Sequence, residues 1–180
     1  MKQYTPITIL SLFTTLTLSA STQTILTDTQ TIKTDLSALQ SQVEAFSGSN
    51  ATLLNALNIK TAADKVDKDI QTTTSDTSSS AHFSDTDSAS IASSISSLQV
   101  QVFDTIDALV AKKESFTKGK LGIDAVSIVH DELVMLRQDT GYFGANVTEK
   151  LTPELRKVAP LLVDNIDFHF VRGVQAFESS

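Results

Sequence analysis

The residues that could carry out acid–base chemistry in this sequence gather first around one histidine. Ser127, His130 and Asp131 supply the residue types of a catalytic triad, in which a histidine takes a proton from a serine. Three near neighbours on one predicted helix seldom reach triad geometry, and no oxyanion hole is evident in the sequence. We therefore predict no catalytic residue at this position.

A second group combines His169 with Asp164 and Asp167, which are residue types that bind metal ions. They flank Phe168 and Phe170 on a predicted helix, and we expect a polar surface there rather than a metal site. The sequence motifs of serine hydrolases, zinc proteases and phosphate-binding loops are missing, and there is no cysteine nucleophile. The sequence thus predicts a protein that is not an enzyme and uses no cofactor or metal.

The composition favours one domain with an aliphatic core. The 180 residues are 41% apolar and 19% charged, aromatic residues are few, and tryptophan is missing. The formal charge of −7 repels phosphate backbones, so nucleic acid is not an expected partner. Without cysteine, the folded chain must hold together by packing alone.

The first residues resemble a secretory signal peptide. Lys2 precedes an apolar run from Ile7 to Leu18, and small residues suited to signal peptidase follow at 19–21. We predict a signal peptide over residues 1–21 and a mature domain over 22–180 with no transmembrane segment. Asn50 and Asn146 each begin an Asn-x-Thr sequon, so both are predicted glycosylation sites of a secreted protein.

Apolar residues spaced by threes and fours predict helices throughout the mature chain. The central stripe consists of Ile91, Ile95, Leu98, Val102, Ile106 and Leu109. Similar stripes predict helices over 24–46, 51–71, 85–114 and 123–150, and a last helix that begins after Thr152 and is kinked by Pro160. No segment alternates as a strand does. We predict an all-α fold, a single antiparallel bundle of about five helices.

A polar segment interrupts this pattern. Residues 72–80 are Thr, Ser and Asp without one apolar residue, so we predict a Ser/Thr-rich linker at 72–84 inside the domain. The charged residues Lys65, Asp67, Lys68 and Asp69, just before it, are expected on a solvated helix face. Ser84 and Asp87 form a capping-box pattern that predicts the start of the central helix at Asp85.

The order of these parts resembles a known family. The segments that carry the resemblance are 109–116 (LVAKKESF), 151–155 (LTPEL), 163–167 (VDNID) and 173–177 (GVQAF). Together with the leader and the Ser/Thr segment, they are similar to the fungal hydrophobic surface binding protein A family, which includes antigenic cell-wall galactomannoproteins. The resemblance implies a secreted or wall-associated helical domain that adsorbs to hydrophobic surfaces. Some members recruit a polyester-degrading hydrolase, and some hold fatty acids inside the bundle.

We therefore expect fatty acids or other apolar ligands and hydrophobic surfaces as partners, with a secreted hydrolase as a further partner. Ser, Thr and Ala among the inward positions would leave an apolar channel for an acyl chain, or the helices could open and lie on a surface. The alternative is a structural wall mannoprotein or secreted effector that acts through protein contacts. The predicted ligand-binding residues are the inward positions Leu98, Val102, Phe103, Ile106, Leu133, Leu136, Phe143 and Ile166.

Overall fold

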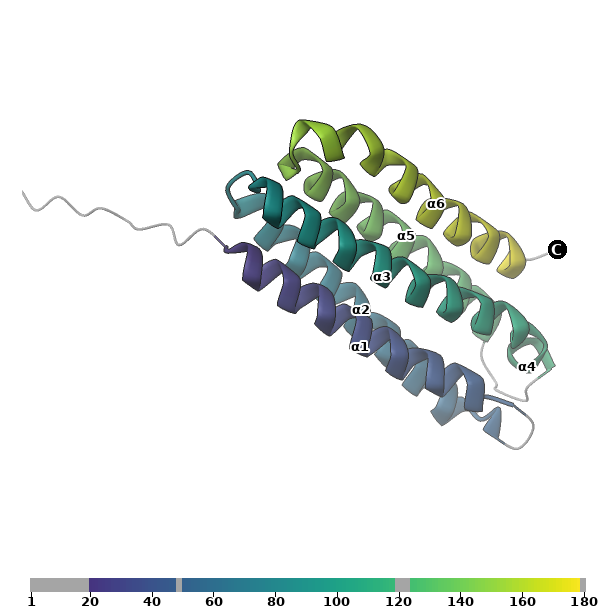
Figure 1. Ribbon diagram of the computed structural model, residues 1–180. Helices are drawn as coiled ribbons and strands as arrows, with labels where there is room; N and C mark the ends of the chain where they lie inside the picture. The colour runs from purple at the N-terminus through teal and green to yellow at the C-terminus, as the bar shows by residue number, and fades with distance from the viewer. Residues whose placement is uncertain (1–19, 48–49, 119–123, 179–180) are drawn as a thin grey trace, which may run out of the picture.

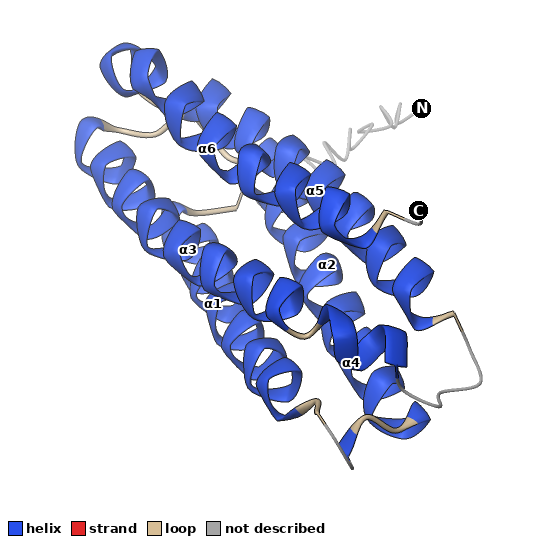
Figure 2. Cartoon of the chain, turned by 90° about the vertical axis from the view of Figure 1, so that its right-hand side faces the viewer, coloured by secondary structure: helices blue, strands red, loops and turns tan. Residues whose placement is uncertain are grey.

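The computed structural model describes residues 20–47, 50–118 and 124–178, and these ranges hold six helices and no β-strand (Figure 2). The predicted signal peptide lies almost entirely outside the described residues. The helices are α1 (Thr22–Ala45), α2 (Leu53–Ser79), α3 (Asp85–Ala111), α4 (Lys113–Lys118), α5 (Ala125–Lys150) and α6 (Pro153–Phe177). None of these helices has the length and apolarity that crossing a bilayer requires.

The five long helices form a closed ring. α1 packs against α2 and α3, α2 packs against α5, α5 packs against α6, and α6 returns to α3. Successive long helices alternate in direction, as Figure 1 shows. The ring order nevertheless makes three neighbouring pairs parallel, namely α1 with α3, α2 with α5, and α3 with α6. The predicted all-α bundle is confirmed, and its helices surround a central axis.

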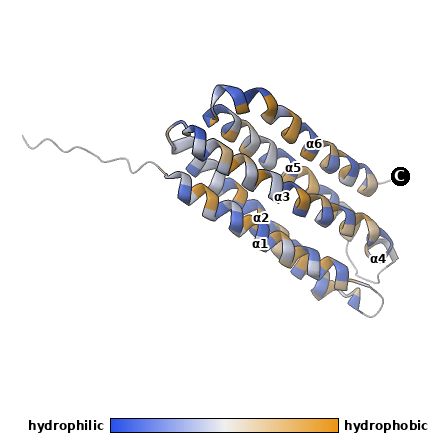
Figure 3. Ribbon diagram, in the orientation of Figure 1, coloured by the Kyte–Doolittle hydropathy of each residue, from blue (hydrophilic) through white to orange (hydrophobic). Residues whose placement is uncertain are grey.

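The predicted apolar stripes point into this ring. In α1 the stripe from Ile25 to Val43 is buried. It includes Thr29, whose hydroxyl donates to the Ile25 carbonyl at 2.8 Å. Each long helix carries both apolar and polar residues along its length (Figure 3). The buried apolar residues of all helices form one core, because each helix turns its stripe toward the same axis.

The ends of the ring are closed by buried apolar residues. At one end the rings of Phe46 and Phe116 stack with centroids 4.5 Å apart, and Phe177 meets Phe116 edge-on at 6.0 Å. At the other end Phe83 and Leu151 are buried, and the Phe83 amide donates to the Lys150 carbonyl at 2.9 Å. Solvent therefore reaches the centre of the ring from the side rather than along its axis.

The start of α3 agrees with the predicted cap, whereas its end does not lie where it was predicted. Ser84 accepts a hydrogen bond from the Asp87 amide at 3.2 Å and donates to the Asp87 carboxylate at 2.7 Å, so the predicted cap before α3 is confirmed. α3 ends at Ala111 rather than Glu114, because the helix is interrupted at Lys112 before the short α4 begins. α6 continues as one helix through Pro160. The predicted kink there stays a prediction.

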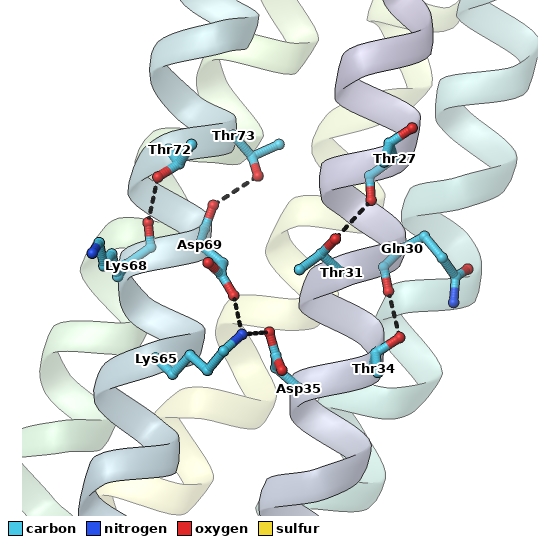
Figure 4. Close-up of polar contacts among 10 residues, drawn as sticks. All are labelled: Thr27, Gln30, Thr31, Thr34, Asp35, Lys65, Lys68, Asp69, Thr72 and Thr73. Carbon is cyan, nitrogen blue, oxygen red and sulfur yellow. Dashed lines mark hydrogen bonds and ion pairs between the residues drawn. The ribbon is translucent and has the colours of Figure 1, made fainter.

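The predicted linker at 72–84 is wrong over most of its length, because α2 continues to Ser79. Thr73 and Thr77 are fully buried and satisfy their hydroxyls on carbonyls four residues earlier, at 2.7 Å each. Figure 4 shows this bond for Thr73 and for other threonines of α1 and α2. A hydroxyl bonded to its own helix leaves its methyl group free to pack. The remaining short loop is held by Lys150, whose ammonium donates to the carbonyls of Ser78 and Ser80.

The charges of α2 do not lie on one solvated face, which corrects a second expectation. Lys65 pairs with Asp35 of α1 and with Asp69 of its own helix, and so bridges α1 and α2 (Figure 4). Asp67 is only 8% exposed and faces α5. The parallel pair α2 and α5 places polar residues between the two helices, and the four-residue spacing of the apolar stripe could not reveal this.

Asp67 lies in a group of polar side chains shared by α2 and α5. Gln71 Nε2 donates to Asp67 Oδ2 at 2.8 Å and to Asp139 Oδ2 at 2.7 Å. Burial, followed by the hydrogen bond with the Asp139 carboxyl, raises the pKa of Asp67 from 3.8 to about 6. Nearby, the buried Glu132 bonds to the Lys60 ammonium at 2.7 Å. The α2–α5 contact is therefore sensitive to protonation.

Two glycines of α5 differ in their surroundings, although the helix continues through both as predicted. A Cβ atom at Gly141 would meet no atom within 4 Å, whereas one at Gly144 would lie 2.9 Å from Val163 Cγ2 of α6. Gly144 thus allows α6 to approach α5 closely. No packing contact requires glycine at position 141.

Asp67→Asn should raise the free energy of unfolding at pH 7 by about 1–2 kcal/mol, because the wild type must keep a charged carboxylate in a buried place. In the wild type, the raised folded-state pKa gives a stabilising contribution that is present below about pH 4 and lost as the pH rises through about 6. The advantage of the variant should therefore shrink at pH 4.5. Urea unfolding at both pH values measures it, and Asp104→Asn at an exposed site of α3 is the control. An equal gain at both pH values would contradict this account.

The glycine pair supplies a matched stability test. Gly141→Ala should raise the free energy of unfolding by about 0.5–1 kcal/mol, because alanine loses less backbone freedom on folding. Gly144→Ala should lower it, since the β-branched Val163 has few other rotamers and must shift. Thermal and urea unfolding of the two variants provide the comparison. A loss of stability at position 141 would refute the open space inferred beside that residue.

Candidate functional site

A cavity of about 200 Å³ lies inside the ring and is lined by all five long helices. Its inner walls come from the apolar stripes of α1, α2 and α3, and its remaining wall comes from α5 and α6. The apolar lining residues are Ile32, Leu36, Leu39, Val66, Ile70, Ile95, Leu98, Val102, Ile106, Leu109, Leu133, Leu136, Phe143, Val163, Ile166 and Phe170. A space of this kind suits an apolar guest rather than a charged or strongly hydrated one.

The structure brings seven of the eight predicted ligand-binding residues together around this cavity. These are Leu98, Val102 and Ile106 of α3, Leu133, Leu136 and Phe143 of α5, and Ile166 of α6. Each is buried. They converge because their helices turn the same stripe toward the ring axis. Whether they contact a ligand stays a prediction.

Phe103 is the exception. Its ring stacks on His169 of α6, with centroids 3.3 Å apart and planes 9° apart, and it does not line the cavity. Phe103 directly follows the buried Val102, and one helical step of about 100° turns its side chain from the ring axis toward α6. The sequence pattern placed Phe103 among the inward positions together with Val102 and did not distinguish these two directions.

The lining residues of α1 and α2 were not predicted as ligand contacts. Their stripes were visible in the sequence, but periodicity does not reveal which helices surround a shared space. Polar lining residues were missed as well. They are Thr105 of α3, Arg137 and Thr140 of α5, and Asp164 and Asp167 of α6. The two aspartates had been considered only as partners of His169.

The mouth of the cavity lies along the seam between α5 and α6. The lining residues of α1 and α2 are buried, as Leu36 and Val66 illustrate. By contrast, Gly141 of α5 and Asp164 of α6 are exposed, and Thr140 is half-buried. Water therefore meets the cavity at this seam, where a polar head group could remain hydrated while a tail is buried.

An ion pair spans the mouth. Arg137 Nε lies 2.6 Å from Asp167 Oδ1, and Arg137 Nη2 lies 3.0 Å from Asp167 Oδ2, so the guanidinium and the carboxylate form a two-pronged contact. Hydrogen bonding to Asp167 raises the pKa of Arg137, which stays charged throughout the ordinary pH range. The mouth thus combines one cation with the carboxylates of Asp167 and Asp164.

A second hollow of about 340 Å³ lies on the outer side of α3, α5 and α6. It shares Ile95, Gly144 and Val163 with the lining of the central cavity, so these residues form the partition between the two spaces. The outer hollow is largely apolar and includes the first half of α6. Here Leu161 is 72% exposed, and Val158 is 53% exposed. The first half of α6 therefore exposes apolar side chains beside this hollow.

The histidine clusters considered in the sequence have ordinary helix-surface contacts. Ser127 Oγ donates to Asp124 at the start of α5, at 2.6 Å, while His130 Nδ1 lies 3.1 Å from Asp131. His169 Nδ1 lies 3.1 Å from the Asn165 carbonyl. Within the described ranges, no three His, Cys, Asp or Glu side chains are placed to share a metal ion.

The two predicted glycosylation sites differ in accessibility. Asn50 is exposed in the connection between α1 and α2. Asn146 is half-buried within α5, and its amide nitrogen donates to the Tyr142 carbonyl at 2.9 Å. A glycan on the Asn146 nitrogen would have to fit beside this hydrogen bond on a half-buried part of α5, so the geometry favours Asn50 as an acceptor.

Comparison with known proteins gives a consistent family and fold. Residues 22–149 match the model of the hydrophobic surface binding protein A family. A search among curated proteins found no match. The crystal structure of AfMP4p in complex with palmitic acid is 25% identical in sequence and has a TM-score of 0.82, covering 88% of this chain and 100% of that chain.

Two domains of the Penicillium marneffei MP1 protein share the fold. Ligand-binding domain 1, complexed with arachidonic acids, is 15% identical with a TM-score of 0.79, and the match covers 88% of this chain and 100% of that one. Ligand-binding domain 2, complexed with multiple arachidonic acids, is 17% identical with a TM-score of 0.76, covering 88% and 94% respectively.

Proposed function

Because this chain belongs to the hydrophobic surface binding protein A family, we propose that it is a secreted, non-catalytic protein that takes fatty acyl chains into the centre of its helical ring. The observation that carries the proposal is the apolar cavity, whose lining comes from all five long helices. The palmitic acid bound to AfMP4p, a protein with the same fold, supports this choice of ligand class.

The size of the cavity indicates how a guest fits. Its volume of about 200 Å³ is below the roughly 300–1,000 Å³ of common ligand pockets. A long acyl chain must therefore displace side chains or pass Val163 into the outer hollow. At about 0.8 kcal/mol per buried methylene, a fourteen-carbon chain offers on the order of 10 kcal/mol before immobilisation costs are subtracted. Micromolar affinity corresponds to about 8 kcal/mol, so the gross burial term exceeds that value before the immobilisation costs are subtracted.

Two valines of α3 give a matched test of cavity binding. Val102 lines the cavity and is buried, whereas Val100 is 59% exposed on the same helix. Val102→Phe should fill part of the cavity and weaken binding of palmitic acid by about tenfold or more, because the phenyl group occupies the volume of several methylenes. Val100→Phe should change it less than about twofold.

The measurement is displacement of a fluorescent fatty acid from delipidated protein, with circular dichroism and thermal unfolding to verify folding. Mass spectrometry of the extract from undelipidated protein should show a stoichiometric fatty acid. Equal affinities for both variants and the wild type would count against binding in the central cavity.

A second candidate function, adsorption to hydrophobic surfaces, is favoured by the uncovered half of α6. Val158 and Leu161 project from the rim of the outer hollow, where the ring leaves them exposed. Exposed aliphatic side chains beside an apolar groove give a surface that can bury area against wax, lipid or plastic. In this mechanism the ring stays closed.

Replacing Val158 and Leu161 together by Gln should markedly reduce retention on octyl-coated beads, because the apolar area available for contact is lost. Phe168→Gln is the control, since Phe168 is 62% exposed on the same helix but does not line the outer hollow. Retention should be measured with the intact and the internally cross-linked protein. If Phe168→Gln lowers retention as much as the double variant, adsorption is not specific to the outer hollow.

Secretion and association with the cell wall extend the same proposal, with support from the leader pattern at residues 1–21 and from the family. The exposed sequon at Asn50 is the proposed glycosylation site. Recruitment of a secreted hydrolase rests on the family resemblance alone and stays a prediction. If the protein neither binds fatty acid nor is retained on octyl-coated beads, this result would instead support the structural mannoprotein or effector alternative.

A further inference from the structure

We propose that Arg137 binds the carboxylate of a fatty acid and that Asp167 competes with the ligand for the same guanidinium. This inference rests on the proposed function, since it assumes that the acyl tail occupies the central cavity. It adds the position of the head group and the residue that distinguishes a free acid from a neutral lipid.

The first argument is the position of the mouth. A bound lipid keeps its polar end at water, and the α5–α6 seam is where the lining residues reach the surface. Arg137 lies on the same face of α5 as Thr140 and Gly141, three and four residues further on. Among the residues lining the cavity, Arg137 is the one with a positive charge.

The second argument is that Asp167 can be displaced. The side chains of Arg137 and Asp167 are 42% and 47% exposed. An ion pair this accessible to water contributes about 0–1 kcal/mol, so exchanging one carboxylate for another costs little. A fatty acid presents the same two-oxygen fork that Asp167 presents to Nε and Nη2. Its buried tail holds that fork beside the guanidinium at high effective concentration.

The third argument is the charge that remains when Arg137 stays paired with Asp167. Asp164 also lines the mouth, three residues earlier on α6, and the pair with Asp167 cancels the only positive charge among the lining residues. An anionic head group would then face Asp164 without compensation. A long-chain acid therefore gains a cationic partner for its head group only by taking Arg137 from Asp167, whereas an ester or alcohol relies on burial of its tail alone.

The test compares palmitic acid with methyl palmitate on delipidated full-length mature protein at pH 7.4 and low salt. Arg137→Gln should lower the affinity for palmitic acid by roughly tenfold, because a charge-assisted contact is lost from the acid alone. The affinity for methyl palmitate should change by less than about twofold. Asp167→Asn should raise the affinity for palmitic acid by about threefold or more, since the competing carboxylate and its charge are removed. Methyl palmitate should again change little.

A second exposed pair supplies the matched control. Arg172 of α6 pairs with Asp107 of α3, their side chains are 47% and 55% exposed, and neither lines the cavity. Arg172→Gln and Asp107→Asn make the same charge changes away from the mouth and should alter palmitic acid affinity by less than about twofold. Thermal unfolding verifies that all four variants are folded.

The outcomes separate the head-group contact from the proposed function. The inference is supported if Arg137→Gln lowers and Asp167→Asn raises the affinity for palmitic acid while neither changes the affinity for methyl palmitate. Equal shifts for acid and ester, equal shifts in the control pair, or weaker acid binding by Asp167→Asn would overturn the head-group contact while cavity binding stands. Wild-type protein that binds neither palmitic acid nor methyl palmitate would overturn the proposed function and this inference together.

Discussion

The closed ring of five helices is the constraint on which the rest of the structure depends. Helices that pack side by side at about 9–10 Å place each axis about 8 Å from the centre of a five-membered ring. With side chains, a helix has a radius of about 5–6 Å, so inward residues leave a central gap of about 2–3 Å radius. Four helices would close this gap. The cavity is thus a consequence of helix number and ring order, and the inward Ile, Leu and Val side chains set its shape.

The ring also explains the unusual distribution of polar residues. Each long helix packs against two neighbours in the ring, so side chains at several positions along its length become buried. Threonines solve this by bonding to their own helix, as Thr73 and Thr77 do. Carboxylates are harder to bury, because a charged group needs several hydrogen-bond donors around it. Asp67 must share hydrogen bonds with Gln71 and another carboxyl, and its raised pKa reflects that environment.

The sequence revealed the fold where the structure depends on spacing, and it failed where the structure depends on neighbours. The stripe of α3 and the continuity of α5 through Gly141 followed from helical phase alone. The helix beyond Gln71 was missed because its buried positions are threonines, which hydropathy counts as polar. Lining residues of α1, and the pairing of Arg137 with Asp167 thirty residues away, depend on the ring order. A single sequence contains no signal for that order.

The position of α6 has a consequence for the rate of exchange. α6 is the last described helix, it follows α5 after only Leu151 and Thr152, and buried aromatic residues seal the end of the ring opposite this turn. An outward swing of α6 about that turn would break its contacts with α3 and α5 and the Phe177–Phe116 contact, while α1 would keep its packing against α2 and α3, and α2 its packing against α5. If ligand exchange requires this movement, its rate is set by the local opening of one helix and not by unfolding of the whole domain. Residence time and equilibrium affinity therefore depend on different residues.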